Sequence, residues 1–216
     1  MWAVPSDRGG SFVRAGARSV IGSHDQRPER ERTMRIALTV VFILLGTVAD
    51  SGYAQTIIAG HGFAADCSRL VVRGKFDPST LDICSKAIEH DQLKRDDAAK
   101  THVNRGVVYL RRGSFEKAAK DFDRAEALMP ELAEIYVNRG AILMQQHRWT
   151  EAIAQIEHGI ALKPAELEKA YFNRGLAREH LDDFRGAYAD LSMAAKLKPN
   201  WDAPKIEMQR YTVVRR

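Results

Sequence analysis

The chain has 216 residues, of which 45% are hydrophobic and 28% are charged, and it carries a net charge of +5 at neutral pH. This composition is typical of a globular protein with enough apolar residues to build a core. The positive charge is mild, and no basic patch interleaved with aromatic residues occurs in the sequence, so we expect no nucleic-acid partner.

The first elements in chain order are an extension and a targeting segment. Residues 1–33 are rich in Arg, Gly and Ser and lack apolar periodicity, which predicts disorder. In residues 34–54 a positive residue precedes an apolar run, and Gly52 and Ala54 stand three and one positions before a cut after Ala54. This pattern is typical of a secretory signal peptide. We therefore expect a periplasmic or secreted protein, with a membrane anchor only if the segment stays uncut, since a span needs about 20 apolar residues.

The extension fits poorly ahead of a signal peptide. We hypothesise that Met34 rather than Met1 is the true start; an Arg-rich transit peptide is the rival interpretation. Cys67 and Cys84 both lie after the predicted cut. An even number of cysteines in an exported chain favours one disulfide, and two buried free thiols are the alternative.

A tripeptide, Asn-Arg-Gly, occurs three times, at residues 104–106, 138–140 and 173–175. Aromatic, alanine and proline positions follow the same period of 34 to 35 residues. A fixed period of this length predicts a stack of repeats. Within each repeat, apolar residues at helical spacing, a turn and a final proline predict two helices. The three predicted units are residues 99–132, 133–166 and 168–201.

The glycines and arginines of the tripeptide are predicted to serve the scaffold. Glycine in a helix interior costs about 1 kcal/mol relative to alanine, so its recurrence indicates close helix packing. Its expected small partners are Ala118, Ala152 and Ala187. The arginines point toward the partner helix, where acids such as Asp121, Asp123 and Asp190 are the expected partners.

The three units resemble the tetratricopeptide repeat (TPR) family. The resemblance rests on Tyr-x-x-Arg-Gly in two units and on Ala-x-x-x-large-residue followed by proline in all three. It implies an all-α, helix-turn-helix solenoid. Residues 61–98 look like a degenerate TPR-like helix pair, in which Cys67 and Cys84 would face each other. Residues 202–212 are predicted to form a capping helix.

The resemblance implies a concave groove lined by the first helix of each unit. The asparagines of the tripeptide fall at groove-facing positions, and an amide side chain offers both a donor and an acceptor to a peptide backbone. This is similar to the asparagine ladder of O-linked N-acetylglucosamine transferase repeats. At helix spacings of about 8–10 Å, each asparagine would meet roughly every third residue of an extended ligand. The predicted peptide-binding residues are Asn104, Asn138, Asn173, Val103, Val137 and Phe172.

No phosphate loop, catalytic triad or paired metal ligands occur in the sequence, so we predict no enzyme activity, no cofactor and no metal site. The favoured function is a periplasmic protein–protein interaction scaffold that binds an extended peptide of a partner the sequence does not name. The alternative is a membrane-anchored or self-associating component of an envelope assembly.

Overall fold

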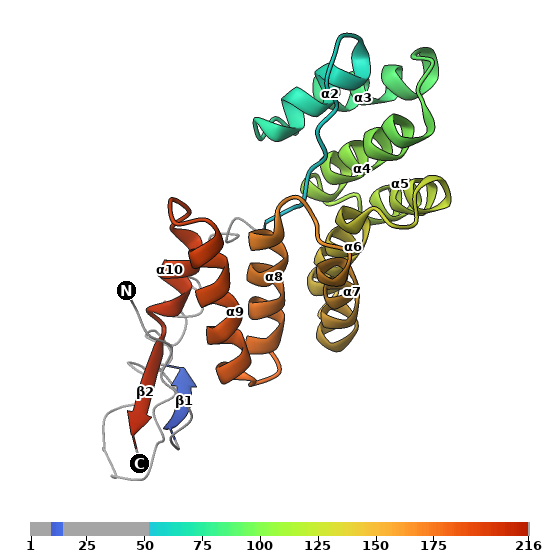
Figure 1. The fold of residues 1–216 in the computed structure, drawn as a ribbon. Coiled ribbons are helices and arrows are strands. Elements are labelled where there is room, and N and C mark those ends of the chain that lie inside the picture. Colours follow the sequence, from blue (N-terminus) through green and yellow to red (C-terminus); the bar gives the residue numbers. More distant parts are fainter. Residues whose placement is uncertain (1–9, 15–51, 216) are drawn as a thin grey trace, which may run out of the picture.

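The structure, a computed structural model, describes residues 10–14 and 52–215. Nearly all of the predicted extension and of the signal segment, and the choice between Met1 and Met34, lie outside these residues. The described part confirms the predicted all-α solenoid: helix pairs stack side by side along one curved axis (Figure 1). The pairs are α2 (Phe63–Val72) with α3 (Pro78–His90), α4 (Arg95–Arg111) with α5 (Phe115–Leu128), α6 (Ala133–Gln145) with α7 (Trp149–Ala161), and α8 (Leu167–Glu179) with α9 (Phe184–Leu197).

The glycines of the tripeptide let the two helices of each pair touch. A methyl group placed on Gly106 would lie 2.5 Å from the ring of Phe122, and one on Gly140 would lie 2.4 Å from Ile156. Backbone is close as well, since the carbonyl oxygen of Ala152 lies 3.1 Å from the same methyl position on Gly140. The predicted close packing is therefore present. The larger side chain one turn after the alanine makes the nearest contact in these two pairs.

The arginines of the tripeptide pair with acids on the second helices. Arg105 donates to both carboxylate oxygens of Asp121 at 2.9 and 2.8 Å, and Arg174 does the same to Asp190. In the middle unit, Gln155 occupies the position of these two aspartates. Arg139 instead reaches back to α5, where it donates to Asp123 at 2.6 Å and to Glu126 at 2.7 Å. The middle arginine thus joins two repeats.

The first helix pair is cross-linked. Cys67 on α2 and Cys84 on α3 form a disulfide with an S–S distance of 2.02 Å and a Cα–Cα distance of 4.9 Å, as predicted. Both cysteines are fully buried. A terminal pair packs against a neighbour on one side only, so a covalent link there replaces part of the missing packing.

Two predictions about the chain ends are corrected. Helix α10 covers Ala203–Met208, shorter than the predicted 202–212, and Tyr211–Arg215 forms strand β2. The β-branched residues Thr212, Val213 and Val214 favour a strand over a helix. Within the extension predicted to be disordered, Gly10–Arg14 forms strand β1, which pairs antiparallel with β2. The backbone N–H and C=O groups of β2 pair with those of Gly10–Arg14, which gives this part of the extension a hydrogen-bonding partner.

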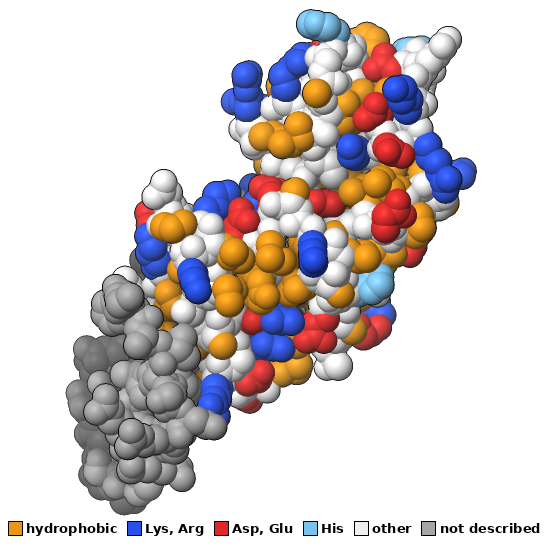
Figure 2. All heavy atoms as spheres, viewed as in Figure 1, with side chains coloured by type: hydrophobic (Ala, Val, Ile, Leu, Met, Phe, Trp, Pro, Cys, Tyr) orange, Lys and Arg blue, Asp and Glu red, His pale blue; other side chains and the backbone are white. Residues whose placement is uncertain are grey.

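Charged side chains of both signs are interspersed over the face shown in Figure 2, with an apolar stretch across the middle of the solenoid. Before α2, the chain from Gly52 to Gly60 has no regular secondary structure. This extended segment runs beside α8, α6 and α4 before the chain enters α2 (Figure 1). This segment lies in the predicted groove.

Candidate peptide-binding groove

The three predicted asparagines bind the backbone of the chain's own residues 52–56. Asn104 Nδ2 donates to the Thr56 carbonyl at 3.0 Å, and its Oδ1 accepts from the Thr56 amide at 3.1 Å. Asn138 pairs with Ala54 in the same way, at 2.8 and 3.1 Å. Asn173 Nδ2 donates to the Gly52 carbonyl at 3.1 Å. The asparagine ladder is therefore formed, and its occupant is part of the same chain.

The ladder contacts every second residue, whereas the sequence predicted every third. Residues 52, 54 and 56 meet successive asparagines. Two residues of extended chain span about 7 Å, which is less than the 8–10 Å between packed helix axes. The asparagines point inward from a concave surface, so their amides lie closer together than the helix axes. The same two-residue step gives all three contacted residues the same orientation toward the groove.

Gly52, Ala54, Thr56 and Ile58 are buried along this segment, while Ile57 is 73% exposed. A methyl group on Gly52 would lie 2.7 Å from two side-chain carbons of Lys169, so only glycine fits there without movement of that lysine. Ala54 is fully buried in one apolar cluster with Val137, Ile156 and Ala170. The groove floor thus accepts small side chains opposite Asn173 and Asn138.

The predicted apolar partners of the asparagines are all fully buried. Val137 shares the cluster of Ala54, and Val103 shares the cluster of Tyr53. Phe172 packs instead in a cluster with Leu191, and its ring centre lies 4.8 Å from that of Trp201. The structure therefore brings two of the three into the apolar clusters that the segment joins, and places Phe172 in the interior of the last unit.

Two charged residues outside the set of six predicted peptide-binding residues also hold the segment. Lys169 Nζ donates to the Tyr53 carbonyl at 2.9 Å, and Glu166 Oε2 accepts from the Gln55 amide at 2.9 Å. The two side chains pair with each other at 2.6 Å. Lys169 occupies the repeat position of Lys100, whose carbonyl accepts from the Thr56 hydroxyl. A charged residue recurs at this helical position, as Lys100, Glu134 and Lys169, so the repeat itself predicts that Lys169 faces the groove.

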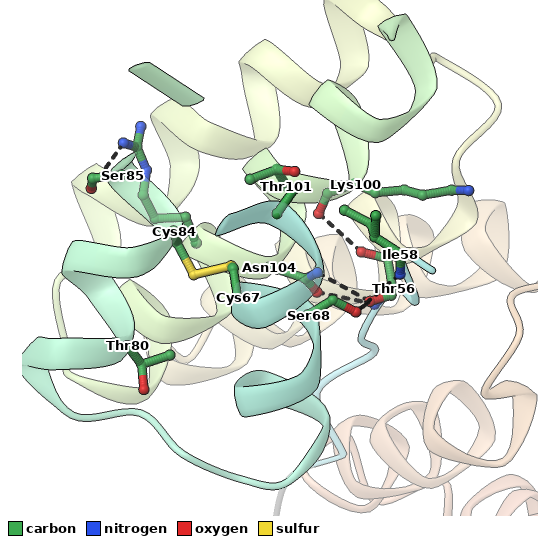
Figure 3. The surroundings of a disulfide bond; sticks show 12 residues. Thr56, Ile58, Cys67, Ser68, Thr80, Cys84, Ser85, Lys100, Thr101 and Asn104 are labelled. Carbon is green, nitrogen blue, oxygen red and sulfur yellow. Dashed lines mark hydrogen bonds between the residues drawn. A yellow bond between two sulfur atoms is a disulfide. The ribbon is translucent and has the colours of Figure 1, made fainter. Parts of the chain in front are cut away.

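The segment ends beside the disulfide. Ser68 on α2 donates its hydroxyl proton to the Thr56 carbonyl and accepts from the Ile58 amide, both at 3.0 Å. Figure 3 shows Thr56 between Asn104 and Ser68, with Cys67 next to Ser68. Because Cys67 is tied to α3, the disulfide fixes the helix that carries Ser68. Residues 56–58 are thereby attached to the most strongly cross-linked part of the solenoid.

Beside the segment lies a hollow of about 560 Å³. The guanidinium of Arg111 lies 5.1 Å from the ring centre of Tyr53 and 4.9 Å from that of Phe76. Cation–π contacts of this kind hold Tyr53 at the edge of the hollow. Four basic side chains and one acidic side chain line it: Arg73, Arg111, Lys169, Lys198 and Glu166.

Two further searches cover residues 10–14 and 52–215 only. Within them, no three His, Cys, Asp or Glu side chains gather as a potential metal site. In the same residues, no helix has both the length and the apolar character that crossing a membrane requires.

Fold and groove together define a helical-repeat protein with an extended segment in its concave groove. Residues 106–147 match the profile of the family described as TPR repeat. The resemblance to TPR proteins is thereby confirmed for these residues. No curated protein matches the chain.

Solved TPR structures resemble the described fold. The structure of Pseudomonas aeruginosa pilF has a TM-score of 0.56 at 22% identity, covering 68% of this chain and 64% of that chain. The Arabidopsis OM64 TPR domain has a TM-score of 0.50 at 25% identity, covering 54% of this chain and 96% of that domain. MamA from Desulfovibrio magneticus RS-1 has a TM-score of 0.51 at 20% identity, covering 68% and 79%.

Proposed function

We propose that this protein is a non-enzymatic periplasmic scaffold that binds an extended peptide segment of a partner protein in its concave groove. One observation carries the proposal: the asparagine ladder already holds an extended segment by its backbone. Recognition of amide and carbonyl groups does not depend on side-chain identity, so the same ladder can hold a segment of another chain in this conformation.

A predicted signal peptide and the disulfide support the periplasmic part of the proposal. The apolar run in residues 36–48 and the small residues Gly52 and Ala54 fit a signal peptide with a cut after Ala54. The buried Cys67–Cys84 disulfide fits an oxidising compartment, since disulfides are rare in the cytosol. Release of the protein by osmotic shock, with an intact mass that begins at Gln55, is the expected result. Retention in salt-washed membranes with residues 34–54 attached would favour the anchored alternative.

The binding test uses the processed protein, which begins at Gln55, and a fluorescent synthetic peptide with the sequence of residues 50–54, which the cut removes. We expect saturable binding by fluorescence anisotropy. Asn138→Ala combined with Asn173→Ala should weaken it at least about ten-fold, because up to four hydrogen bonds to the peptide backbone are lost. Asn200→Ala, which removes an exposed amide, is the matched control and should bind as the parent does. Equal binding by the double variant and the control would refute groove recognition.

A further inference from the structure

The two halves of the groove hold residues on opposite sides of the predicted cut. Asn138 and Asn173 bind Ala54 and Gly52, which precede it. Asn104 binds Thr56, which follows it. Gly52 and Ala54 are also the two small residues that define the cut in the sequence. The half of the groove formed by α6 and α8 is therefore covered by residues that processing would remove.

Residues 52–54 leave one hydrogen-bonding group of this half of the groove without a partner among the described residues. Asn104 and Asn138 each pair with both the amide and the carbonyl of one residue. Asn173 donates to the Gly52 carbonyl, but its Oδ1 finds no donor within the described part of the chain, although Asn173 is fully buried. A buried acceptor without a donor is unfavourable, because it loses its hydrogen bond to water without replacement. An extended ligand with its own amide opposite Asn173 would satisfy this oxygen.

The half-groove also defines the side chains that a ligand can carry. Opposite Asn173 the contact with Lys169 admits glycine, and opposite Asn138 the fully buried position of Ala54 admits a small residue. The residue between them, Tyr53, packs under Arg111 at the edge of the basic hollow. The recognised pattern is small–aromatic–small, and the excess of basic over acidic side chains in the hollow disfavours a basic ligand.

Hydrolysis after Ala54 would separate residues 52–54 from residues 55–58 of the bound segment. A membrane-bound signal peptidase adds water across the Ala54–Gln55 bond, which leaves a carboxylate on Ala54 and an ammonium group on Gln55. The Gln55 nitrogen lies 2.9 Å from Glu166 Oε2, so the new positive charge gains a carboxylate partner. Thr56 and Ile58 keep Asn104 and Ser68. Only three residues on the departing side, Gly52 to Ala54, have described contacts with the groove.

We propose that the α6–α8 half of the groove is a docking site for an extended segment of a partner protein with small residues at two alternate positions and an aromatic residue between them. Residues 52–54 cover this site in the uncut chain, and the cut after Ala54 opens it. This inference rests on the proposed function, and it adds the class of ligand and the step that makes the groove available.

The test compares two forms of the chain: the uncut full chain, produced without export and then oxidised, and the exported, processed protein. The probe is a fluorescent pentapeptide with the sequence of residues 50–54, Asp-Ser-Gly-Tyr-Ala. Its affinity should be at least about ten-fold higher for the processed form, because the covering segment competes at an effective concentration near the millimolar range. A second pentapeptide with leucine in place of the glycine and the alanine should bind the processed form at least about ten-fold more weakly.

Ala54→Arg in the uncut chain provides an independent arm. The buried site of Ala54 cannot hold an arginine, so the segment should leave the groove and pentapeptide binding should rise to within about three-fold of the processed form. Equal affinity of the uncut and processed forms would overturn the covering role while leaving groove binding intact. Equal binding of the leucine peptide would overturn the small-residue rule. A dimer of uncut chains that exchange residues 52–54 would identify a second copy as the occupant and overturn the proposal.

Discussion

The two halves of the groove use the same asparagine ladder with different supports. In the first half, Asn104 and Ser68 hold residues 56–58 next to a disulfide. In the second half, Asn138 and Asn173 hold residues 52–54 without a covalent cross-link at those helices, and one amide oxygen stays without a described donor. The same repeated residue therefore has a cross-linked support at one end of the groove and none at the other, where we propose that it meets a ligand.

The largest expected effect concerns one repeat position on the second helices, which is Asp121 in the first unit and Gln155 in the second. Asp121, behind Asn104, accepts from Arg105 and contacts His102 at 2.9 Å, and its side chain is 5% exposed. Asp121→Ala leaves the half-buried Arg105 without its main partner, so we expect the free energy of unfolding to fall by about 3 kcal/mol. Urea unfolding followed by circular dichroism measures this.

The matched control is Gln155→Ala, at the equivalent position behind Asn138. The Gln155 Oε1 atom is buried and has no hydrogen-bond donor among the described residues. Its removal breaks no hydrogen bond of this atom, so we expect the free energy of unfolding to change by less than about 1 kcal/mol. Similar losses for Asp121→Ala and Gln155→Ala would show that the helices carrying Asn104 and Asn138 are supported alike, which would contradict this prediction.

The second prediction concerns the different contributions of Asn104 and Asn138 to the free energy of unfolding. In the processed protein, Asn104→Ala deprives the buried amide and carbonyl of Thr56 of a partner, so the free energy of unfolding should fall by about 1–3 kcal/mol. Asn138→Ala should change it by less than about 0.5 kcal/mol, because Ala54 has been removed and the asparagine is free to meet water. In the uncut chain both substitutions should destabilise. Faster hydrogen exchange at the Thr56 amide in Asn104→Ala provides the local measurement.

An equal loss for both variants of the processed protein would contradict this division. It would mean that Asn138 supports the helices themselves rather than whatever lies in the groove. The uncut chain serves as the internal control, since both asparagines pair with both backbone groups of one residue there.

Much of the scaffold could be predicted from the sequence because it depends on contacts that repeat with the period. Gly140 and Arg105 each act on a helix a fixed number of residues away, so their roles follow from spacing. The cysteine pair followed from the same logic, since two helices of one hairpin bring Cys67 and Cys84 together. The three asparagines were likewise placed in the groove by their helical position.

What could not be predicted depends on long-range geometry. No periodic signal connects Ala54 with Asn138, which lie 84 residues apart, or Gly10–Arg14 with Tyr211–Arg215. The two-residue step along the ladder depends on the curvature of the solenoid, which a linear repeat does not encode. Gln155 interrupts the aspartate pattern, and the resulting shift of Arg139 to the preceding repeat requires the positions of neighbouring side chains.

The smallest expected effect lies where the two halves meet. Glu126 on α5 accepts from Arg139 on α6, and this hydrogen bond is the main cause that lowers the pKa of Glu126 below its ordinary value of 4.5. A lowered pKa contributes stability that is present above the ordinary value and is lost as the pH falls through the lowered one. Between about pH 5 and pH 3, the melting temperature of Glu126→Gln should therefore fall less than that of the parent.

Salt should reduce the difference between Glu126→Gln and the parent, because Glu126 is partly exposed and its charge is screened. Glu116→Gln, an exposed substitution on the same helix, is the control and should keep the acid dependence of the parent. If the melting temperature of Glu126→Gln depends on pH as that of the parent does, the hydrogen bond between Arg139 and Glu126 contributes no measurable stability to the contact between α5 and α6. Asp123 would then be the acidic partner through which Arg139 joins α6 to α5.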